Sequence, residues 1–231
     1  MNIGVYNEGP LHQALKAHYA VAGSREEVPV GAYVADVQHP DDVIYEIQTG
    51  GFGPLKRKLE ALLEAHRVVL VHPVAAVRYI IKLPESVDLV PRRRRSPKRG
   101  SIAQVAGELV SIPHLLDHPN FELEVVLIEE EEVRCRAEGR AWRRRGWRVV
   151  ERRLCQVLGR QRFASSADLF GLLQGPLPEP FTTVELAVAM GQPRWLAQKL
   201  AYCLRVAGCI EVCGKQGNAL CYQRAPGGVR T

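Results

Sequence analysis

The sequence of 231 residues contains no apolar run that approaches the roughly 20 residues needed to cross a bilayer. Its amino end has neither the basic start nor the apolar stretch of a secretory signal. None of the six cysteines forms a C-x-x-C pair, which favours reduced thiols over a disulfide scaffold or a zinc site. These absences predict a cytoplasmic protein that has no membrane partner.

Nucleotide-binding glycine motifs are absent as well. The segment Gly50 to Gly53 lacks the strand–turn–helix spacing of a dinucleotide fingerprint, and no P-loop is present, so we expect a flexible loop there. What remains is an ordinary globular composition, with 46% hydrophobic and 24% charged residues. The length allows one large domain or two modest ones.

The net charge of +6 conceals a strong segregation of charge. Residues 92–99 hold six basic and no acidic side chains, and residues 134–153 hold nine Arg and two Glu. Between them, residues 100–133 hold eight acidic and no basic side chains. Basic stretches attract polyanions such as nucleic acid. Alternatively, the basic residues are solvated or pair with the acidic run Glu129 to Glu132.

Composition divides the chain into four parts, predicted at residues 1–83, 84–100, 101–163 and 164–224. The second is rich in proline and like charges, both of which oppose a packed element, so we expect a linker or exposed arm. The third part is predicted to form a short helix followed by strands at residues 121–128 and 147–158. Arg140 to Trp147 mixes aromatic with basic residues, as single-strand binders and solvated hairpin tips both do.

The first part shows alternating helix and strand signals. A turn signal over residues 39–42 separates two strands and so predicts a hairpin. The expected order is helix, two hairpin strands, helix and strand, over residues 9–22, 28–37, 43–49, 55–66 and 68–71.

Two acidic residues occupy this hairpin. A five-residue turn over 39–43 places Asp36 opposite Glu46 on one face, whereas a four-residue turn places Asp36 opposite Tyr45. Adjacent carboxylates repel unless a cation lies between them, and Mg²⁺ is the natural oxygen-ligated ion. The simpler interpretation is that both are ordinary solvent-facing strand residues and that Glu8 sits at a helix start.

Glu8 before a helix, Asp36 on one strand and Glu46-Ile47-Gln48 on the next resemble the PD-(D/E)XK nuclease superfamily over about residues 5–83. The resemblance implies a restriction-endonuclease-like core that cuts DNA or RNA phosphodiesters with Mg²⁺ or Mn²⁺. Asp36, Glu46 and the Ile47 carbonyl would bind the metal, and Glu8 would match the extra helix-borne acid of some members. The position of the family's usual lysine holds Gln48 here, and Gln48 would orient water. Lys58, or less readily Lys56, would supply the positive charge beside the attacked phosphate.

The last part predicts three short helices and a hairpin. Thr182 and Glu185 form a capping-box pattern, and the helix from Pro193 is amphipathic. This order resembles a winged-helix module, whose recognition helix would span residues 193–207. The resemblance implies DNA contacts from recognition-helix and hairpin side chains, namely Arg194, Gln198, Arg205 and Lys215.

The sequence thus predicts an α/β (α+β) protein with a restriction-endonuclease-like core followed by a winged-helix domain. The first hypothesis is a Mg²⁺-dependent DNA endonuclease, or a nuclease-like repair or defence protein, acting on duplex or branched DNA. The second is a regulator or adaptor that binds DNA without cutting it. The basic arm Arg92, Arg93, Arg94 and Arg95 would hold DNA in either case. A homodimer is compatible with both, but no dimer surface is evident.

Overall fold

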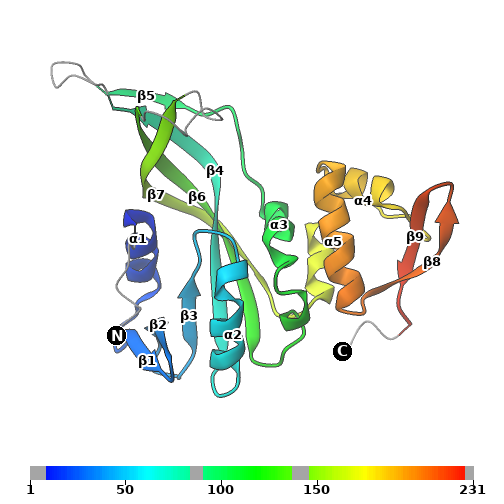
Figure 1. Ribbon diagram of the computed structural model, residues 1–231, viewed down its shortest axis with the longest axis horizontal. Helices are drawn as coiled ribbons and strands as arrows, with labels where there is room; N and C mark the ends of the chain where they lie inside the picture. Colours follow the sequence, from blue (N-terminus) through cyan, green and yellow to red (C-terminus); the bar gives the residue numbers. More distant parts are fainter. Residues whose placement is uncertain (1–8, 84–90, 137–145, 227–231) are drawn as a thin grey trace. The chain divides into compact units, whose positions relative to one another are not determined.

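A computed structural model describes residues 9–83, 91–136 and 146–226. It is a mixed α/β structure with one large sheet and a separate hairpin (Figure 1). The first elements are α1 (Pro10–Tyr19), β1 (Arg25–Val30), β2 (Tyr33–Gln38), β3 (Ile44–Ile47), η1 (Gly53–Leu55) and α2 (Lys56–Leu63). They are followed by β4 (Val68–Lys82), β5 (Arg92–Arg95), η2 (Ile102–Val105), α3 (Ala106–Leu109), η3 (Pro113–Leu115), β6 (Phe121–Arg136) and β7 (Trp147–Phe163). The last are η5 (Ala167–Leu172), α4 (Thr183–Met190), α5 (Arg194–Val206), β8 (Ile210–Gln216) and β9 (Ala219–Arg224).

The large sheet has the order β1-β2-β3-β4-β6-β7, with β5 paired to β4. The chain forms two compact units that are discontinuous in sequence. One comprises residues 1–49, 71–101 and 126–160, and the other comprises residues 50–70, 102–125 and 161–231. The long strands β4, β6 and β7 pass through both units, which is why no single cut in the sequence separates them.

Several predicted elements differ from the observed ones. The run 28–37 is divided by a turn at Gly31, whose φ of +58° suits glycine, so that it contributes to both β1 and β2. The strand expected at 68–71 continues to Lys82, and the strands expected at 121–128 and 147–158 continue to Arg136 and Phe163. Local patterns end where polar residues begin, but pairing with long neighbours extends a strand through them.

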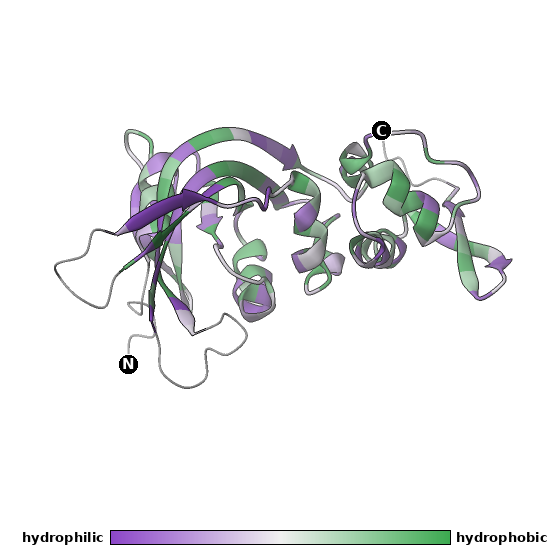
Figure 2. Cartoon of the chain, turned by 90° about the horizontal axis from the view of Figure 1, so that it is seen from above, coloured by the Kyte–Doolittle hydropathy of each residue, from purple (hydrophilic) through white to green (hydrophobic). Residues whose placement is uncertain are grey.

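The expected linker 84–100 contains a strand. Residues 84–90 lie outside the described residues, but β5 pairs antiparallel with β4, with Arg93 opposite Ile81 and Arg95 opposite Tyr79. All four of its arginines are exposed, and β5 is hydrophilic along its length (Figure 2). Backbone pairing therefore overrides the like charge, because each guanidinium still reaches solvent.

In the first unit, α1 packs through Leu11, Leu15 and Tyr19, which are buried, and it contacts β2 and β3. The rings of Tyr19 and Tyr45 lie 5.4 Å apart. The His39 imidazole donates to the Tyr19 carbonyl, Nε2 to oxygen 2.7 Å. These contacts hold α1 against the hairpin that carries the predicted acidic residues.

In the second unit, α5 packs on α3 and η3 through buried side chains that include Leu196, Leu200 and Leu204. Lys199 Nζ donates to the Gly107 carbonyl at 2.9 Å and so joins α5 to α3. The predicted helices and terminal hairpin are confirmed, with α4 ending at Gly191 in the left-handed conformation, φ +59°.

The predicted capping box at α4 is confirmed. Thr182 Oγ1 accepts from the Val184 N–H at 3.1 Å, and Glu185 Oε2 accepts from the Thr182 N–H at 2.9 Å. The Thr182 hydroxyl and the backbone N–H groups of Glu185 and Thr182 lower the pKa of Glu185. Two backbone donors at the helix start are thereby satisfied.

Replacing Thr182 with Ala should lower the free energy of unfolding by about 1 kcal/mol, because an orphan N–H then loses its acceptor. Urea denaturation monitored by circular dichroism measures this change. Val184→Ala is the matched control, since Val184 lies on the same helix and is 47% exposed. Equal losses in both variants would show that the cap contributes nothing specific.

Candidate functional site

The register of the β2–β3 hairpin decides where Asp36 and Glu46 lie. Val37 pairs with Tyr45 and Gln38 pairs with Ile44, so the turn covers residues 39–43. This is the five-residue alternative, and it places Asp36 opposite Glu46. The alternative that set Asp36 against Tyr45 is therefore wrong.

Beyond these two residue pairs, hydrogen bonds from backbone N–H groups to the two carboxylates join β2 and β3 in place of backbone–backbone hydrogen bonds. The Asp36 N–H donates to Glu46 Oε1 at 3.1 Å, and the Ile47 N–H donates to Asp36 Oδ2 at 2.7 Å. Asp36 and Glu46 are only 8% and 1% exposed. Each carboxylate thus binds the opposite strand, which fixes both of them side by side in a buried position. The interpretation as ordinary solvent-facing strand residues is wrong.

Helix α1 adds further charged groups that sequence reasoning missed. The imidazole of His12 lies with Nε2 3.2 Å from Asp36 Oδ2. One turn further, buried Lys16 forms an ion pair with Glu27. Because Glu26 pairs with Val37 and Val28 with Ala35, Glu27 lies level with Asp36.

Glu27, Asp36 and Glu46 therefore form a row across three neighbouring strands, which we name the acidic row. Glu27 has a φ of +52°, which is uncommon for a side chain of this kind. His12 and Lys16 are four residues apart and so share a face of α1. That spacing is visible in the sequence, but its relation to Glu27 depends on the β1–β2 register.

Ile47 and Gln48 follow the acidic row on β3. Ile47 is buried and Gln48 is half-buried. The Gln48 N–H donates to the Val71 carbonyl at 2.8 Å, and His72 Nδ1 donates to the Gln48 carbonyl at 2.8 Å. Strand β4 thus holds Gln48 in place and adds a half-buried imidazole that the sequence did not indicate.

The remaining predicted catalytic residues are Glu8, Lys58 and the less favoured Lys56. Glu8 lies outside the described residues. Lys58 is half-buried on α2, which belongs to the other compact unit. Lys56 is exposed and pairs with Glu60 on the same helix, Nζ to Oε1 3.9 Å.

The chemistry of the donor set fits a hard divalent cation. Asp36 and Glu46 provide carboxylates and Ile47 provides a carbonyl, the oxygen ligands that Mg²⁺ combines with water and phosphate. Among residues 9–83, 91–136 and 146–226, no group of three or more His, Cys, Asp or Glu side chains is arranged to hold a metal. An ion here would therefore rest on two carboxylates and take its other ligands from water, backbone or substrate.

The four arginines of β5, which were predicted to bind DNA, are all exposed, but they differ in their side-chain interactions. Arg93 donates through Nε to Glu131 Oε1 at 2.8 Å, and its guanidinium lies 3.4 Å from the centre of the Tyr79 ring. The hydrogen bond with Glu131 raises the pKa of Arg93. Within the described residues, Arg92, Arg94 and Arg95 form no hydrogen bond, ion pair or ring contact with another side chain.

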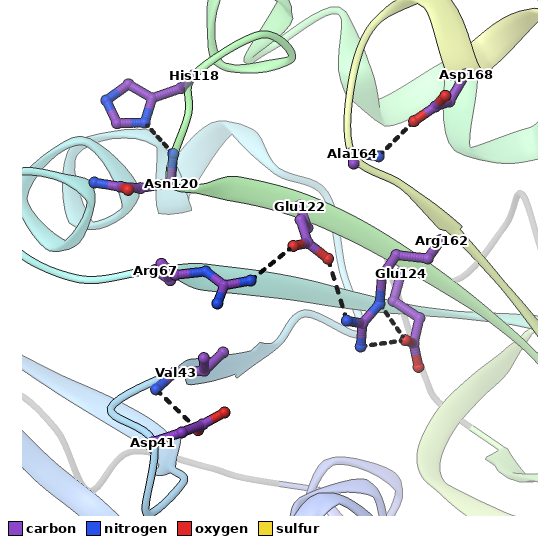
Figure 3. Close-up of polar contacts among 10 residues, drawn as sticks. All are labelled: Asp41, Val43, Arg67, His118, Asn120, Glu122, Glu124, Arg162, Ala164 and Asp168. Carbon is purple, nitrogen blue, oxygen red and sulfur yellow. Dashed lines mark hydrogen bonds and ion pairs between the residues drawn. The ribbon is translucent and has the colours of Figure 1, made fainter. Parts of the chain in front are cut away.

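The acidic run pairs with basic residues of neighbouring strands, as the alternative interpretation of the charge pattern held. Glu130 is 1% exposed, with its Oε1 2.6 Å from Arg78 Nε and its Oε2 3.9 Å from Arg152 Nη1. In the second unit, Glu122 lies between Arg67 and Arg162, at 3.3 and 3.1 Å (Figure 3). Much of the acidic charge of residues 100–133 is therefore paired with arginine, in part with arginines from outside the two basic stretches. Most of Arg140 to Trp147 falls in 137–145, outside the described residues.

On α5, all three predicted DNA-contacting residues, Arg194, Gln198 and Arg205, are exposed. Trp195 and Tyr202 are exposed on the same helix, at 56% and 43%. Sequence reasoning missed these two, although exposed aromatics between arginines are a recognisable signal. Lys215 is exposed on β8.

A cavity in the second unit is lined by Asp117, His118, Ser166 and Cys209, among others. The Ser166 hydroxyl donates to Asp117 Oδ2 at 2.7 Å and lies 2.8 Å from Cys209 Sγ. Burial raises the pKa of Cys209, and it raises the pKa of Cys203 to about 12. Both thiols thus stay neutral, which does not suit a nucleophile.

No helix in the described part of the chain is long and apolar enough to span a membrane. Residues 9–164 match the family model described as "Domain of unknown function (DUF8091)". A protein of Treponema pallidum (strain Nichols), described as "Uncharacterized protein", is 35% identical over 229 residues, covering 99% of this chain and 90% of its own length. No solved structure matches.

Proposed function

The chain belongs to the DUF8091 family, and we propose that it is a Mg²⁺- or Mn²⁺-dependent, nuclease-like protein that hydrolyses DNA phosphodiester bonds. The observation that carries this proposal is the pair of buried carboxylates, Asp36 and Glu46, held side by side where the β2–β3 ladder gives way to their own hydrogen bonds. Burying two like charges together is costly unless a cation is bound between them.

The order of elements around this pair supports the same proposal. Helix α1, the antiparallel strands β1, β2 and β3, the helices η1 and α2, and strand β4 follow one another in the chain. Apart from β1 and η1, this is the order that the resemblance to the PD-(D/E)XK superfamily implies. We assign residues 164–224 to a winged-helix module, supported by its three helical segments followed by the β8–β9 hairpin.

In this proposal Asp36, Glu46 and the Ile47 carbonyl hold the ion. A bound Mg²⁺ supplies Lewis-acid stabilisation of a phosphate and lowers the pKa of water. Gln48, held by β4 through its backbone, orients the water. Glu8 assists as a further acid, and His12 positions Asp36 through its contact with Oδ2.

The test is a cleavage panel with the full-length chain. Supercoiled, linear, branched and single-stranded DNA are incubated with Mg²⁺ or Mn²⁺, and parallel reactions contain EDTA. We expect cleavage of at least one substrate, abolished by EDTA. Absence of cleavage with both metals, or equal cleavage in EDTA, would overturn the proposal.

One observation favours a second function, binding of DNA without cleavage. Gln48 cannot place positive charge beside an attacked phosphate, whereas the exposed arginines of β5 and α5 need no catalytic site. This alternative predicts salt-sensitive DNA binding that survives loss of both carboxylates. Arg194→Ala combined with Arg205→Ala tests it better than truncation, because α5 packs on α3 and its removal would expose the core.

A further inference from the structure

Exposed apolar side chains gather in the carboxy-terminal part of the chain. Of eleven exposed large hydrophobic residues in the described part, seven lie there: Val184, Val188, Trp195, Tyr202, Val206, Val212 and Leu220. Single exposed apolar residues are normal, but such a concentration is typical of a binding surface.

On α5 these residues form an ordered pattern. At about 100° per residue, Trp195, Tyr202 and Val206 fall within about 40° of one another around the helix. Arg194, Gln198 and Arg205 form a second stripe about 80° away. The outward face of α5, defined by these six residues, thus presents an aromatic stripe beside a basic one.

The charge of this face indicates which kind of partner it can bind. Residues Arg194–Val206 include three basic and no acidic side chains. A second copy docking through the same face would therefore bring like charges together. Lys199 is fixed by the Gly107 carbonyl at 2.9 Å and lies 5.6 Å from the Trp195 ring centre, so it supports the ring from the side of α3.

We propose that the outward face of α5 binds unpaired nucleotides of DNA, with Trp195 and Tyr202 stacking on bases and Arg194 and Arg205 contacting phosphates. A single strand exposes both apolar base faces and anionic phosphates, whereas a duplex keeps its base faces stacked inside. The choice of DNA as the nucleic acid rests on the proposed function. The inference places the single-stranded part of a substrate at this helix.

The experiment measures fluorescence anisotropy of a labelled oligothymidine and of a labelled duplex of equal length with the full-length protein over a salt series. Trp195→Ala and Tyr202→Ala should each weaken single-strand binding roughly 5- to 150-fold, with little change in the salt slope. Arg205→Ala should reduce that slope by about 0.7. Trp195→Phe should retain most of the affinity because it keeps a ring, and Leu158→Ala is the exposed control from outside the carboxy-terminal part, at 44% exposure.

Unchanged single-strand affinity in both alanine variants would overturn the inference, as would equal losses for single strand and duplex. If the wild type does not bind the oligonucleotide but self-associates in a way that Trp195→Ala abolishes, the face is a protein interface and the inference is wrong. Asp41→Asn, at an exposed acid outside both the acidic row and α5, should bind like the wild type. If Trp195→Ala weakens single-strand binding but no DNA is cleaved, this inference holds and the nuclease proposal fails. If DNA is cleaved but Trp195→Ala binds single strands like the wild type, the nuclease proposal holds and this inference fails.

Discussion

Replacing Asp36 with Asn should lower metal-dependent DNA cleavage roughly 1000-fold, because a metal site loses one of its two carboxylates. Asparagine keeps an oxygen that can accept from the Ile47 N–H, which Asp36 Oδ2 binds at 2.7 Å. The fold should therefore survive. Initial cleavage rates at saturating Mg²⁺ measure the effect.

Asp41→Asn is the matched control for this prediction. Asp41 is an exposed acid in the same hairpin, and its carboxylate accepts from the Val43 N–H at 3.4 Å (Figure 3). It should cleave like the wild type. Equal cleavage rates for Asp36→Asn and the wild type would show that the acidic row takes no part in the reaction.

A second readout does not depend on activity. Mg²⁺ should raise the melting temperature of the wild type, because an ion that binds the folded state alone stabilises it, by about 2.7 kcal/mol at 100 times its Kd. Asp36→Asn should lose this increase, and without Mg²⁺ it should melt no lower than the wild type, because repulsion with Glu46 is relieved. A metal-induced shift that persists in the variant would place the ion elsewhere.

Replacing Arg78 with Met should lower the free energy of unfolding by about 3 kcal/mol. Glu130 is 1% exposed and its Oε1 lies 2.6 Å from Arg78 Nε, whereas Arg152 lies 3.9 Å from the other oxygen. Loss of Arg78 thus leaves a buried carboxylate without its close partner. Urea denaturation of the full-length chain measures the change.

The double replacement Arg78→Met with Glu130→Leu should recover most of this loss, because an apolar pair of similar volume needs no desolvation of charge. Arg94→Met is the matched control, since Arg94 lies exposed on β5 beside the same strand. If the double variant is as unstable as the single one, the ion pair does more than compensate its own burial.

The carboxy-terminal elements were predictable because their signals are local. Thr182 and Glu185 are three residues apart, and the apolar face of α5 repeats within one helix, so neighbouring residues decide both. The same helical spacing accounts for buried residues of α1 and α5, namely Leu11, Leu15, Leu196, Leu200, Cys203 and Leu204.

The acidic row shows where such reasoning ends. Sequence alone proposed Asp36 and Glu46 and stated that a turn of four or five residues would decide their faces. The tertiary structure decided for five, since Val37 pairs with Tyr45. It also added Glu27 through the β1–β2 register and His12 through the packing of α1.

The sequence by itself determined the capping box at Thr182, the succession of helices and hairpin in the carboxy-terminal part and the segregation of charge, because these depend on side chains close together in the chain. Only the tertiary structure decided which charges meet: Arg78 and Glu130 are 52 residues apart, and Arg93 and Glu131 are 38 apart. Cross-strand neighbours depend on register and on the path of the whole sheet, and no local pattern specifies either.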